Sequence, residues 1–222
     1  MIGGVAPTIR VCYKEAIGQL GVQPQMCSMR KFHDGYRKFR ERYVKRDSTL
    51  LRSLHEEGQN PSALMIACSD SRVDPAIVLQ ADPGDIFMVR NVANLVPPYG
   101  PDQKHHGTSS ALEYGVRYLH IPNIIVCGHS SCGGITAHIT KELPQDDFIS
   151  EWLSIIPPYE HDTPINVGAK KSLIYSGENL LTYPWIKERV VKGELAIHLW
   201  FFNIPKGEIE AYNEQTNTFN PL

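Results

Sequence analysis

The sequence predicts an α/β fold with a mainly parallel central β-sheet flanked by helices. Four short apolar runs are typical of strands that are buried on both faces, and segments with helical periodicity separate them. Strands that alternate with helices along a chain indicate a parallel sheet. At 222 residues the chain is long enough for one sizeable core. We therefore expect a single domain over residues 1–222.

The first expected element is a helical arm over residues 30–57, ahead of a core at 58–222. Apolar residues recur in the arm three or four positions apart, as on one face of a helix: Phe32, Tyr36, Phe39, Tyr43 and Val44. A break near Asp47-Ser48 divides the arm into two helices, because Asp or Ser can cap the second one. Residues 1–29 contain few acidic residues; we interpret them as an N-terminal extension, and a role in organellar targeting stays open.

The core follows in the order expected for a parallel sheet. The four predicted strands cover residues 63–68, 86–89, 124–127 and 195–200. Helices are predicted from Ser109 to Leu119 and from Glu178 to Val191, where apolar residues have helical spacing. The segment Ile209–Tyr212 follows a Pro-Lys-Gly turn, so we expect it to return as an antiparallel edge strand.

The composition excludes several classes of function. A formal net charge of -2, with no dense Lys/Arg tract, argues against a nucleic-acid partner. No apolar run reaches the length of about 18 residues that a transmembrane helix needs, so we predict no membrane span. The 5 cysteines form an odd set without a signal-peptide pattern, which favours a reducing compartment. We therefore expect a cytoplasmic protein.

Two short segments carry the candidate chemistry, and each follows a predicted buried strand. Cys68 begins the first segment, Cys-Ser-Asp-Ser-Arg, and the second contains His129 and Cys132 in Gly-His-Ser-Ser-Cys-Gly-Gly. Sites in open parallel sheets form outside the carboxyl ends of the strands, so both segments can reach one point. Two thiolates and one imidazole suit a tetrahedral zinc ion, and three protein ligands leave the fourth position to water, as in catalytic sites.

Asp70 and Arg72 lie in the first of these segments. A carboxylate beside the metal-bound water can accept its hydrogen bond and orient the resulting hydroxide. Arg72 can hold Asp70 through a bidentate fork and keep it ionised. In the second segment, Gly133 and Gly134 place no side chain beside the metal, so a small substrate can approach. The chemistry predicted is attack of zinc hydroxide on a small electrophile.

These motifs together resemble the β-class carbonic anhydrases, over most of the chain from about Gln59 onward. The segments Arg90–Tyr99 and Leu180–Trp185 resemble the plant-like branch in particular. The resemblance implies reversible hydration of carbon dioxide to bicarbonate, with one Zn²⁺ per subunit held by Cys68, His129 and Cys132. It also implies a catalytic dyad of Asp70 and Arg72; in some members of the family the aspartate instead closes the site as a fourth zinc ligand.

The resemblance further implies a small substrate pocket and an oligomer. Gln59 matches a glutamine that hydrogen-bonds the substrate oxygen, and the residues that match the apolar lining, with the glycine beside them, are Phe87, Val92, Tyr114 and Gly133. In the family, the residues matching Gln59, Phe87 and Tyr114 reach the site across a dimer interface. We therefore expect a homodimer or a higher homo-oligomer, with the 30–57 arm as a dimerisation element.

One departure from the family concerns the exit of the proton. Some plant-like members carry a histidine as proton carrier four residues after the pocket tyrosine, and here that position is Tyr118. The histidines that remain as candidates are His105, His106 and His120.

Several alternatives stay open. Buried thiols with a core histidine, or a cysteine nucleophile with a histidine base, would also place these residue types near strands. Asp70 and Arg72 could form a purely structural ion pair. At the level of function, the alternatives are a carbon disulfide or carbonyl sulfide hydrolase on the same fold, and a non-catalytic zinc protein that senses bicarbonate. Cys127 is expected to be a core residue.

Overall fold

The computed structural model describes residues 29–46, 49–102, 104–141, 143–144 and 146–222. The prediction for residues 1–29 therefore falls almost wholly outside the described residues, as does the expected break at Asp47-Ser48. The chain divides into two compact units, of which the first ends at Thr49 and the second spans Leu50–Leu222.

In the first unit, the described residues form α1 (Arg30–Arg40), which continues as the π-helical η1 (Glu41–Arg46). Neither segment contains a buried residue. The side chains predicted to form the apolar face of α1 are largely exposed, among them Phe32 at 60% and Tyr36 at 62%. Helix formation is supported by pairs of opposite charge one turn apart, such as Lys45 and Glu41 at 3.0 Å.

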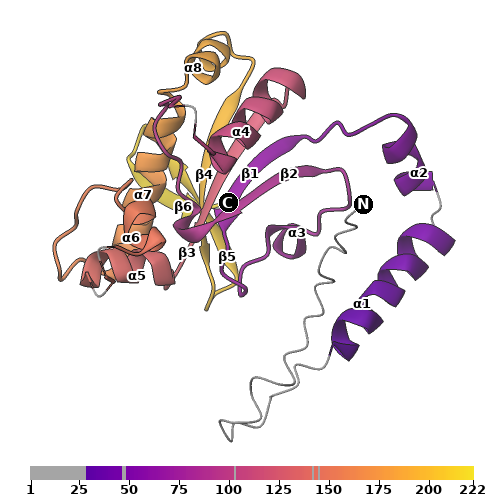
Figure 1. Cartoon of the computed structure of the whole chain (residues 1–222), viewed down its shortest axis with the longest axis horizontal. Helices are drawn as coiled ribbons and strands as arrows, with labels where there is room; N and C mark the ends of the chain where they lie inside the picture. Colours follow the sequence, from indigo (N-terminus) through magenta and orange to yellow (C-terminus); the bar gives the residue numbers. More distant parts are fainter. Residues whose placement is uncertain (1–28, 47–48, 103, 142, 145) are drawn as a thin grey trace, which may run out of the picture. The chain divides into compact units, whose positions relative to one another are not determined.

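The second unit is built on a six-stranded sheet in the order β2-β1-β3-β4-β5-β6 (Figure 1). Its strands are β1 (Ala63–Cys68), β2 (Ile86–Asn91), β3 (Asn123–His129), β4 (Ala196–Asn203), β5 (Glu208–Asn213) and β6 (Thr218–Pro221). The first four are parallel to one another, and β5 and β6 are added antiparallel. The predicted α/β fold with a mainly parallel sheet is confirmed.

Helices precede the sheet and connect its parallel strands. They are α2 (Thr49–Glu56), α3 (Pro75–Val78), α4 (Gly107–Glu113) with its π-helical continuation η3 (Tyr114–Tyr118), α5 (Gly133–Thr140), α6 (Phe148–Leu153), α7 (Ile165–Leu180) and α8 (Pro184–Val191). A short 3-10 turn, η2 (Val92–Asn94), follows β2. The long helix α7 packs along β3 and β4 (Figure 1).

The two faces of the sheet bury unequal amounts of apolar surface. Every residue of β1 is buried, and alternate side chains point to opposite faces. Leu64 and Ile66 belong to the large core cluster, which includes residues of α4, α5 and α7. Met65 belongs to a smaller cluster with Ala63 and Ile125 on the other face. The carboxyl end of β1 is thus fixed by packing on both sides.

Two local expectations are wrong, and a third is confirmed with one more strand than expected. The helix predicted from Glu178 to Val191 is two helices, because α7 ends at Leu180 and α8 starts at Pro184, whose ring and missing N–H fit only a first turn. The expected antiparallel return of Ile209–Tyr212 is confirmed as part of β5, and β6 extends this antiparallel edge of the sheet by one more strand. The prediction that the strand at 86–89 is buried on both faces is wrong. β2 is an edge strand of the described sheet, so its side chains are only half-buried.

No helix among the described residues is both long enough and apolar enough to span a membrane.

Candidate metal centre

Three donor side chains meet at the carboxyl ends of neighbouring parallel strands. Cys68 is the last residue of β1, His129 is the last residue of β3, and Cys132 precedes the first turn of α5. Because β1 pairs directly with β3, the strand ends lie next to each other. The donor atoms of the three residues all lie within 4.8 Å of one another, and the two Sγ atoms are 3.9 Å apart. The predicted ligand cluster is confirmed.

The chemistry of this cluster fits a metal ion. Cys68, His129 and Cys132 are 5%, 1% and 1% exposed, so none of the three faces open solvent. His129 Nδ1 lies 3.0 Å from the carbonyl oxygen of Ser130, to which it can donate its proton. That leaves Nε2 as a lone-pair donor, and this buried atom has no hydrogen-bond partner among the described residues. Two thiols and an imidazole are the donors that zinc prefers.

The two cysteines have very different acidities. A hydrogen bond from the Cys132 thiol, assisted by His129, lowers the pKa of Cys68 to about 4, although burial opposes the shift. The same hydrogen bond, together with burial, raises the pKa of Cys132. Cys68 is therefore the more acidic of the two thiols, and both thiols would have to lose their protons to bind a metal ion.

Asp70 lies beside the cluster and is held by Arg72. Arg72 Nε and Nη2 donate to Asp70 Oδ1 and Oδ2 at 2.9 and 2.7 Å, and the Arg72 backbone N–H donates to Oδ1 at 2.9 Å. These hydrogen bonds hold the pKa of the Asp70 carboxyl well below its usual range. Its Oδ2 lies 3.9 Å from His129 Nε2. An ionised carboxylate thus borders the donor cluster without belonging to it.

Arg72 also joins the two site loops, since its Nη2 donates to the carbonyl oxygen of Ser131 at 3.0 Å. Ser131 has a φ of 54°, in the left-handed region that non-glycine residues seldom adopt. Its own N–H donates to Asn166 Oδ1 at 3.0 Å, so the turn between His129 and Cys132 is held from both sides.

Arg90 is a structural residue of the site that the sequence reasoning missed. From β2 its guanidinium donates to the carbonyl oxygens of Cys68, Asp70 and Val73 at 2.9, 2.7 and 2.9 Å, and it pairs with Asp74 at 3.0 Å. A single cation therefore fixes the backbone of the loop after β1. The sequence offered one signal, an arginine at the end of an apolar strand, where a charge needs buried acceptors.

The residues predicted to bind substrate are found in separate places. Val92 lies against the second glycine of the metal loop, because a Cβ on Gly134 would come 2.8 Å from Val92 Cγ1. A Cβ on Gly133 would meet nothing within 4 Å. Phe87 and Tyr114 contact each other, with ring centroids 6.0 Å apart.

Gln59 is exposed in the segment before β1, and Tyr114 is 47% exposed. Among the described residues of this single chain, no hydrogen bond or ring contact links Gln59, Phe87 or Tyr114 to the ligand cluster. Cys127, expected in the core, is half-buried in β3, and burial raises the pKa of its thiol to about 12.

Comparison with known proteins agrees with this geometry. Residues 63–209 match the family model described as carbonic anhydrase. The carbonic anhydrase of Synechocystis sp. is 35% identical over 204 residues, which cover 86% of this chain and 73% of the relative. Beta carbonic anhydrase 3 of Arabidopsis thaliana is 35% identical over 200 residues, covering 83% and 77% of the two chains.

Solved structures show the same fold. The β-carbonic anhydrase CcaA superposes with a TM-score of 0.78 at 34% identity, covering 87% of this chain and 99% of the other. A Coccomyxa β-carbonic anhydrase in complex with acetazolamide superposes with a TM-score of 0.68 at 26% identity, covering 83% and 86%. The chain therefore belongs to the β class of the carbonic anhydrase family, the zinc enzymes that interconvert carbon dioxide and bicarbonate.

Proposed function

We propose that Asp70, held by Arg72, orients the water that attacks carbon dioxide in this carbonic anhydrase. The observation that carries the proposal is the position of the Asp70 carboxylate, 3.9 Å from the unpartnered Nε2 of His129. Zinc bound by Cys68, His129 and Cys132 would supply an acidified water, as in the catalytic zinc sites, carbonic anhydrases among them, where the pKa of water falls to about 7.

The Asp70–Arg72 pair determines what the carboxylate can do. An ionised carboxylate only accepts hydrogen bonds, so Asp70 takes one from the attacking water and turns the oxygen lone pair toward the substrate carbon. Both of its oxygens already accept from Arg72, at 2.9 and 2.7 Å. A role as fourth zinc ligand would compete with these bonds, so we favour the open arrangement, in which the fourth position is left to water.

The substrate pocket is also a proposal. We infer that carbon dioxide lies beside Val92 and Gly133, because it is small and apolar and the space next to Gly133 is open. Gln59 would donate a hydrogen bond to a substrate oxygen, and Phe87 and Tyr114 would complete the apolar wall from a partner subunit. Tyr114 is 47% exposed in the isolated chain, as expected for a residue that contacts a partner.

Two β-carbonic anhydrases from Sordaria macrospora are described as tetrameric, and the structure compared is 26% identical to this chain. We propose a homodimer or a larger homo-oligomer here, with the 30–57 segment as its arm. Sedimentation of the full chain and of Tyr114→Arg would test this, because a charge in the interface should shift the population toward monomer.

We also propose that this protein is cytoplasmic. One relative in Arabidopsis thaliana, beta carbonic anhydrase 5, is named as chloroplastic. Imaging of a fluorescent fusion at the C-terminus would test it.

The experiment for the mechanism is stopped-flow hydration of carbon dioxide with a pH indicator, on protein of known zinc content. Asp70→Asn should lower kcat/KM by about 10²-fold or more, the usual contribution of a positioned acid–base group. The matched control is Asp85→Asn, because the Asp85 carboxylate accepts a hydrogen bond from the Asp82 N–H, outside both site loops. Its kcat/KM should stay close to that of the wild type, since Asp85 contacts neither the donor cluster nor Arg90.

Two outcomes would contradict these conclusions. Equal kcat/KM for the wild type and Asp70→Asn would remove Asp70 from the mechanism. Negligible hydration from about pH 7 to 9 at full zinc occupancy would favour hydrolysis of carbon disulfide or carbonyl sulfide, or a bicarbonate sensor; this window spans the pKa of water on catalytic and on aqueous zinc.

A further inference from the structure

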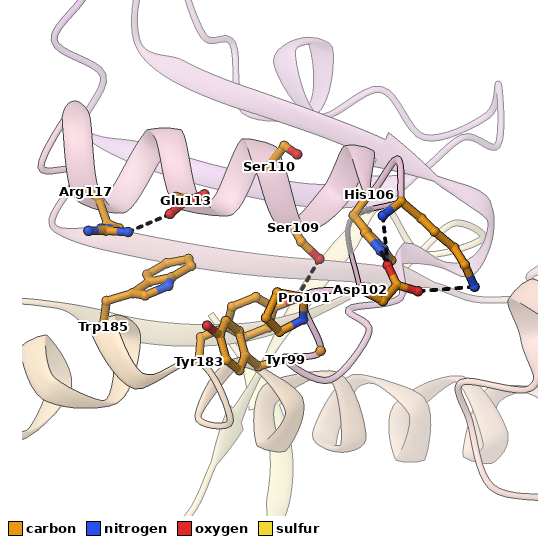
Figure 2. Close-up of a pocket in the computed structure, with 12 residues that line it drawn as sticks. Tyr99, Pro101, Asp102, His106, Ser109, Ser110, Glu113, Arg117, Tyr183 and Trp185 are labelled. Atoms are coloured by element: carbon orange, nitrogen blue, oxygen red, sulfur yellow. Dashed lines mark hydrogen bonds and ion pairs between the residues drawn. The ribbon is translucent and has the colours of Figure 1, made fainter.

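The segment between η2 and α4 carries a histidine–carboxylate pair that the metal centre does not use. His106 Nε2 lies 2.5 Å from Asp102 Oδ1, and Lys104 Nζ lies 3.2 Å from Asp102 Oδ2 (Figure 2). The hydrogen bond from His106, with help from Lys104, holds the pKa of Asp102 below its usual range. The carboxylate is therefore a fixed acceptor for Nε2–H, which leaves Nδ1 of His106 to exchange a proton.

His106 lines two cavities at once. The wider one, of about 960 Å³, is also lined by Asn91, Val92 and Trp152. The second, of about 300 Å³, is lined by Tyr99, Asp102, Lys104, Glu113, Arg117 and Trp185, among others. Figure 2 shows His106 and Asp102 at one end of this second cavity and Arg117 at the other. The side chain of His106 is 39% exposed, so its ring can reach both spaces and solvent.

The wider cavity is lined in part by two residues that adjoin the ligand loops, Asn91 and Val92. Asn91 pairs in register with Cys68, and its carbonyl oxygen accepts from the N–H of Ser69 at 2.9 Å. Val92 lies against Gly134, in the turn that follows Cys132. The cavity wall therefore includes residues that border both ligand loops. Its volume holds many water molecules, since one water takes about 30 Å³.

We propose that His106, positioned by Asp102, carries the proton of carbon dioxide hydration from the cavity beside Val92 to solvent. Hydration of one carbon dioxide by one water yields one bicarbonate and one proton. The proton passes along waters of the cavity to Nδ1 of His106, which becomes an imidazolium paired with Asp102. A buffer base then removes the proton, and the neutral imidazole is restored.

The surrounding charges support this assignment. Glu113 and Arg117 face the second cavity but pair with each other at 2.6 Å, so their charges largely cancel. Lys104 pairs with Asp102 Oδ2, whereas His106 hydrogen-bonds to Oδ1, so the two do not compete for one oxygen. His105 lines the wider cavity but has no carboxylate partner among the described residues, and His120 lines neither cavity. Of the three candidate histidines, only His106 combines a carboxylate with access to both spaces.

The inference rests on carbon dioxide hydration, and its test separates proton transfer from the chemical step. The protein is the zinc-loaded full chain carrying His106→Gln, whose amide can still donate to Asp102 but takes up no proton at neutral pH. In dilute buffer, kcat should fall roughly tenfold or more, since positioned acid–base groups contribute about 10²–10⁴-fold. kcat/KM should stay at the wild-type value, because it reports only steps up to bicarbonate release. Added imidazole should restore kcat.

The matched control is His120→Gln, which should keep the wild-type kcat in dilute buffer. A parallel loss of kcat and kcat/KM in His106→Gln, an unchanged kcat, or no rescue by imidazole would each overturn the proposal. Failure of the Asp70 mechanism would appear separately, as a normal kcat/KM in Asp70→Asn.

A second measurement does not depend on activity. Long-range ¹H–¹⁵N spectra of the zinc-loaded full chain report which nitrogen of His106 carries the proton. We expect Nε2–H in the wild type and loss of that preference in Asp102→Asn, together with a smaller loss of kcat in dilute buffer than in His106→Gln. A proton on Nδ1 of the wild-type ring would overturn the role of Asp102.

Discussion

The loops that follow β1 and β3 both carry zinc ligands, yet they are built in different ways. Most of the loop after β3 lies in the core: His129, Ser130 and Cys132 are at most 2% exposed, whereas Ser131 is exposed. Uncharged hydrogen bonds from the Ser130 N–H to Phe202 O and from the Ile204 N–H to Ser130 Oγ, both 3.0 Å, fix most of it, and the Arg72 guanidinium adds one bond to the Ser131 carbonyl oxygen.

The loop after β1 leaves the core directly after Cys68. Ser69, Ser71 and Arg72 are exposed, and the guanidinium groups of Arg72 and Arg90 hold the loop. One loop is thus held mainly by packing and the other mainly by charge. The metal position therefore depends largely on the core, whereas the carboxylate that we propose to orient the reacting water depends on ion pairs, which respond to pH and salt.

The largest expected effect comes from breaking the buried loop at a ligand. Cys132→Ser should reduce bound zinc from about one ion per chain to nearly none, because a hydroxyl is a poor substitute for a thiolate. Carbon dioxide hydration should fall with it. Elemental analysis after gel filtration measures the metal. Cys127→Ser is the control: this cysteine lies in β3 outside the cluster and should leave zinc content unchanged. Full zinc in Cys132→Ser would show that Cys132 is no ligand.

Two neighbouring glycines test the role of packing in the same loop. Gly134→Ala would place a Cβ 2.8 Å from Val92 and 3.1 Å from the Cβ of Ala93, so we expect a loss of about 1–3 kcal/mol in the free energy of unfolding. Gly133→Ala meets nothing within 4 Å and should change this free energy by less than about 0.5 kcal/mol. Urea unfolding measures both variants. Equal losses would mean that the loop is not held by close packing.

The smallest expected effect concerns the charged loop. Arg72 lowers the pKa of Asp70 in the folded state, so the stabilisation from this pair is fully present above the ordinary Asp pKa of about 3.9 and disappears as pH falls further. The Arg72 side chain is 51% exposed and solvent screens the pair, so its contribution to stability is small.

Urea unfolding of zinc-free wild type and Asp70→Asn, from neutral to acid pH, measures this difference. It should be constant at neutral pH, shrink below about pH 4 and shrink with added salt. A difference that grew toward acid pH would show that the Asp70–Arg72 pair does not stabilise the folded state.

Much of the fold and of the ligand set could be predicted from the sequence, because buried parallel strands appear in a sequence as continuous runs of apolar residues. The apolar runs that end at Cys68 and near His129 predict where two strands end. The metal ligands were then predicted from the residues at those strand ends. The role of Arg90 could not be predicted in this way, since its partners are backbone carbonyls of a loop 17–22 residues away.

The left-handed backbone conformation of two site residues could not be predicted from the sequence either. Ala93 and Ser131 have φ values of 62° and 54°, and neither residue type signals a left-handed turn. The helical spacing of apolar residues continues from Glu178 to Val191 across the boundary between α7 and α8. Pro184 was the one residue in this segment that indicated the boundary. His106 and Asp102 lie four residues apart in a segment without periodicity, so only the structure pairs them.

The register of β1 beside β3 also affects how the chain reaches its native state. Cys68 and Cys132 are 64 residues apart, so the metal centre does not exist until a long loop has closed and two parallel strands have paired. Zinc that binds only the native arrangement lowers the free energy of that state and slows its loss. The zinc ion would then bind late in folding and stabilise the folded chain. The lifetime of the folded state should therefore depend on the supply of zinc.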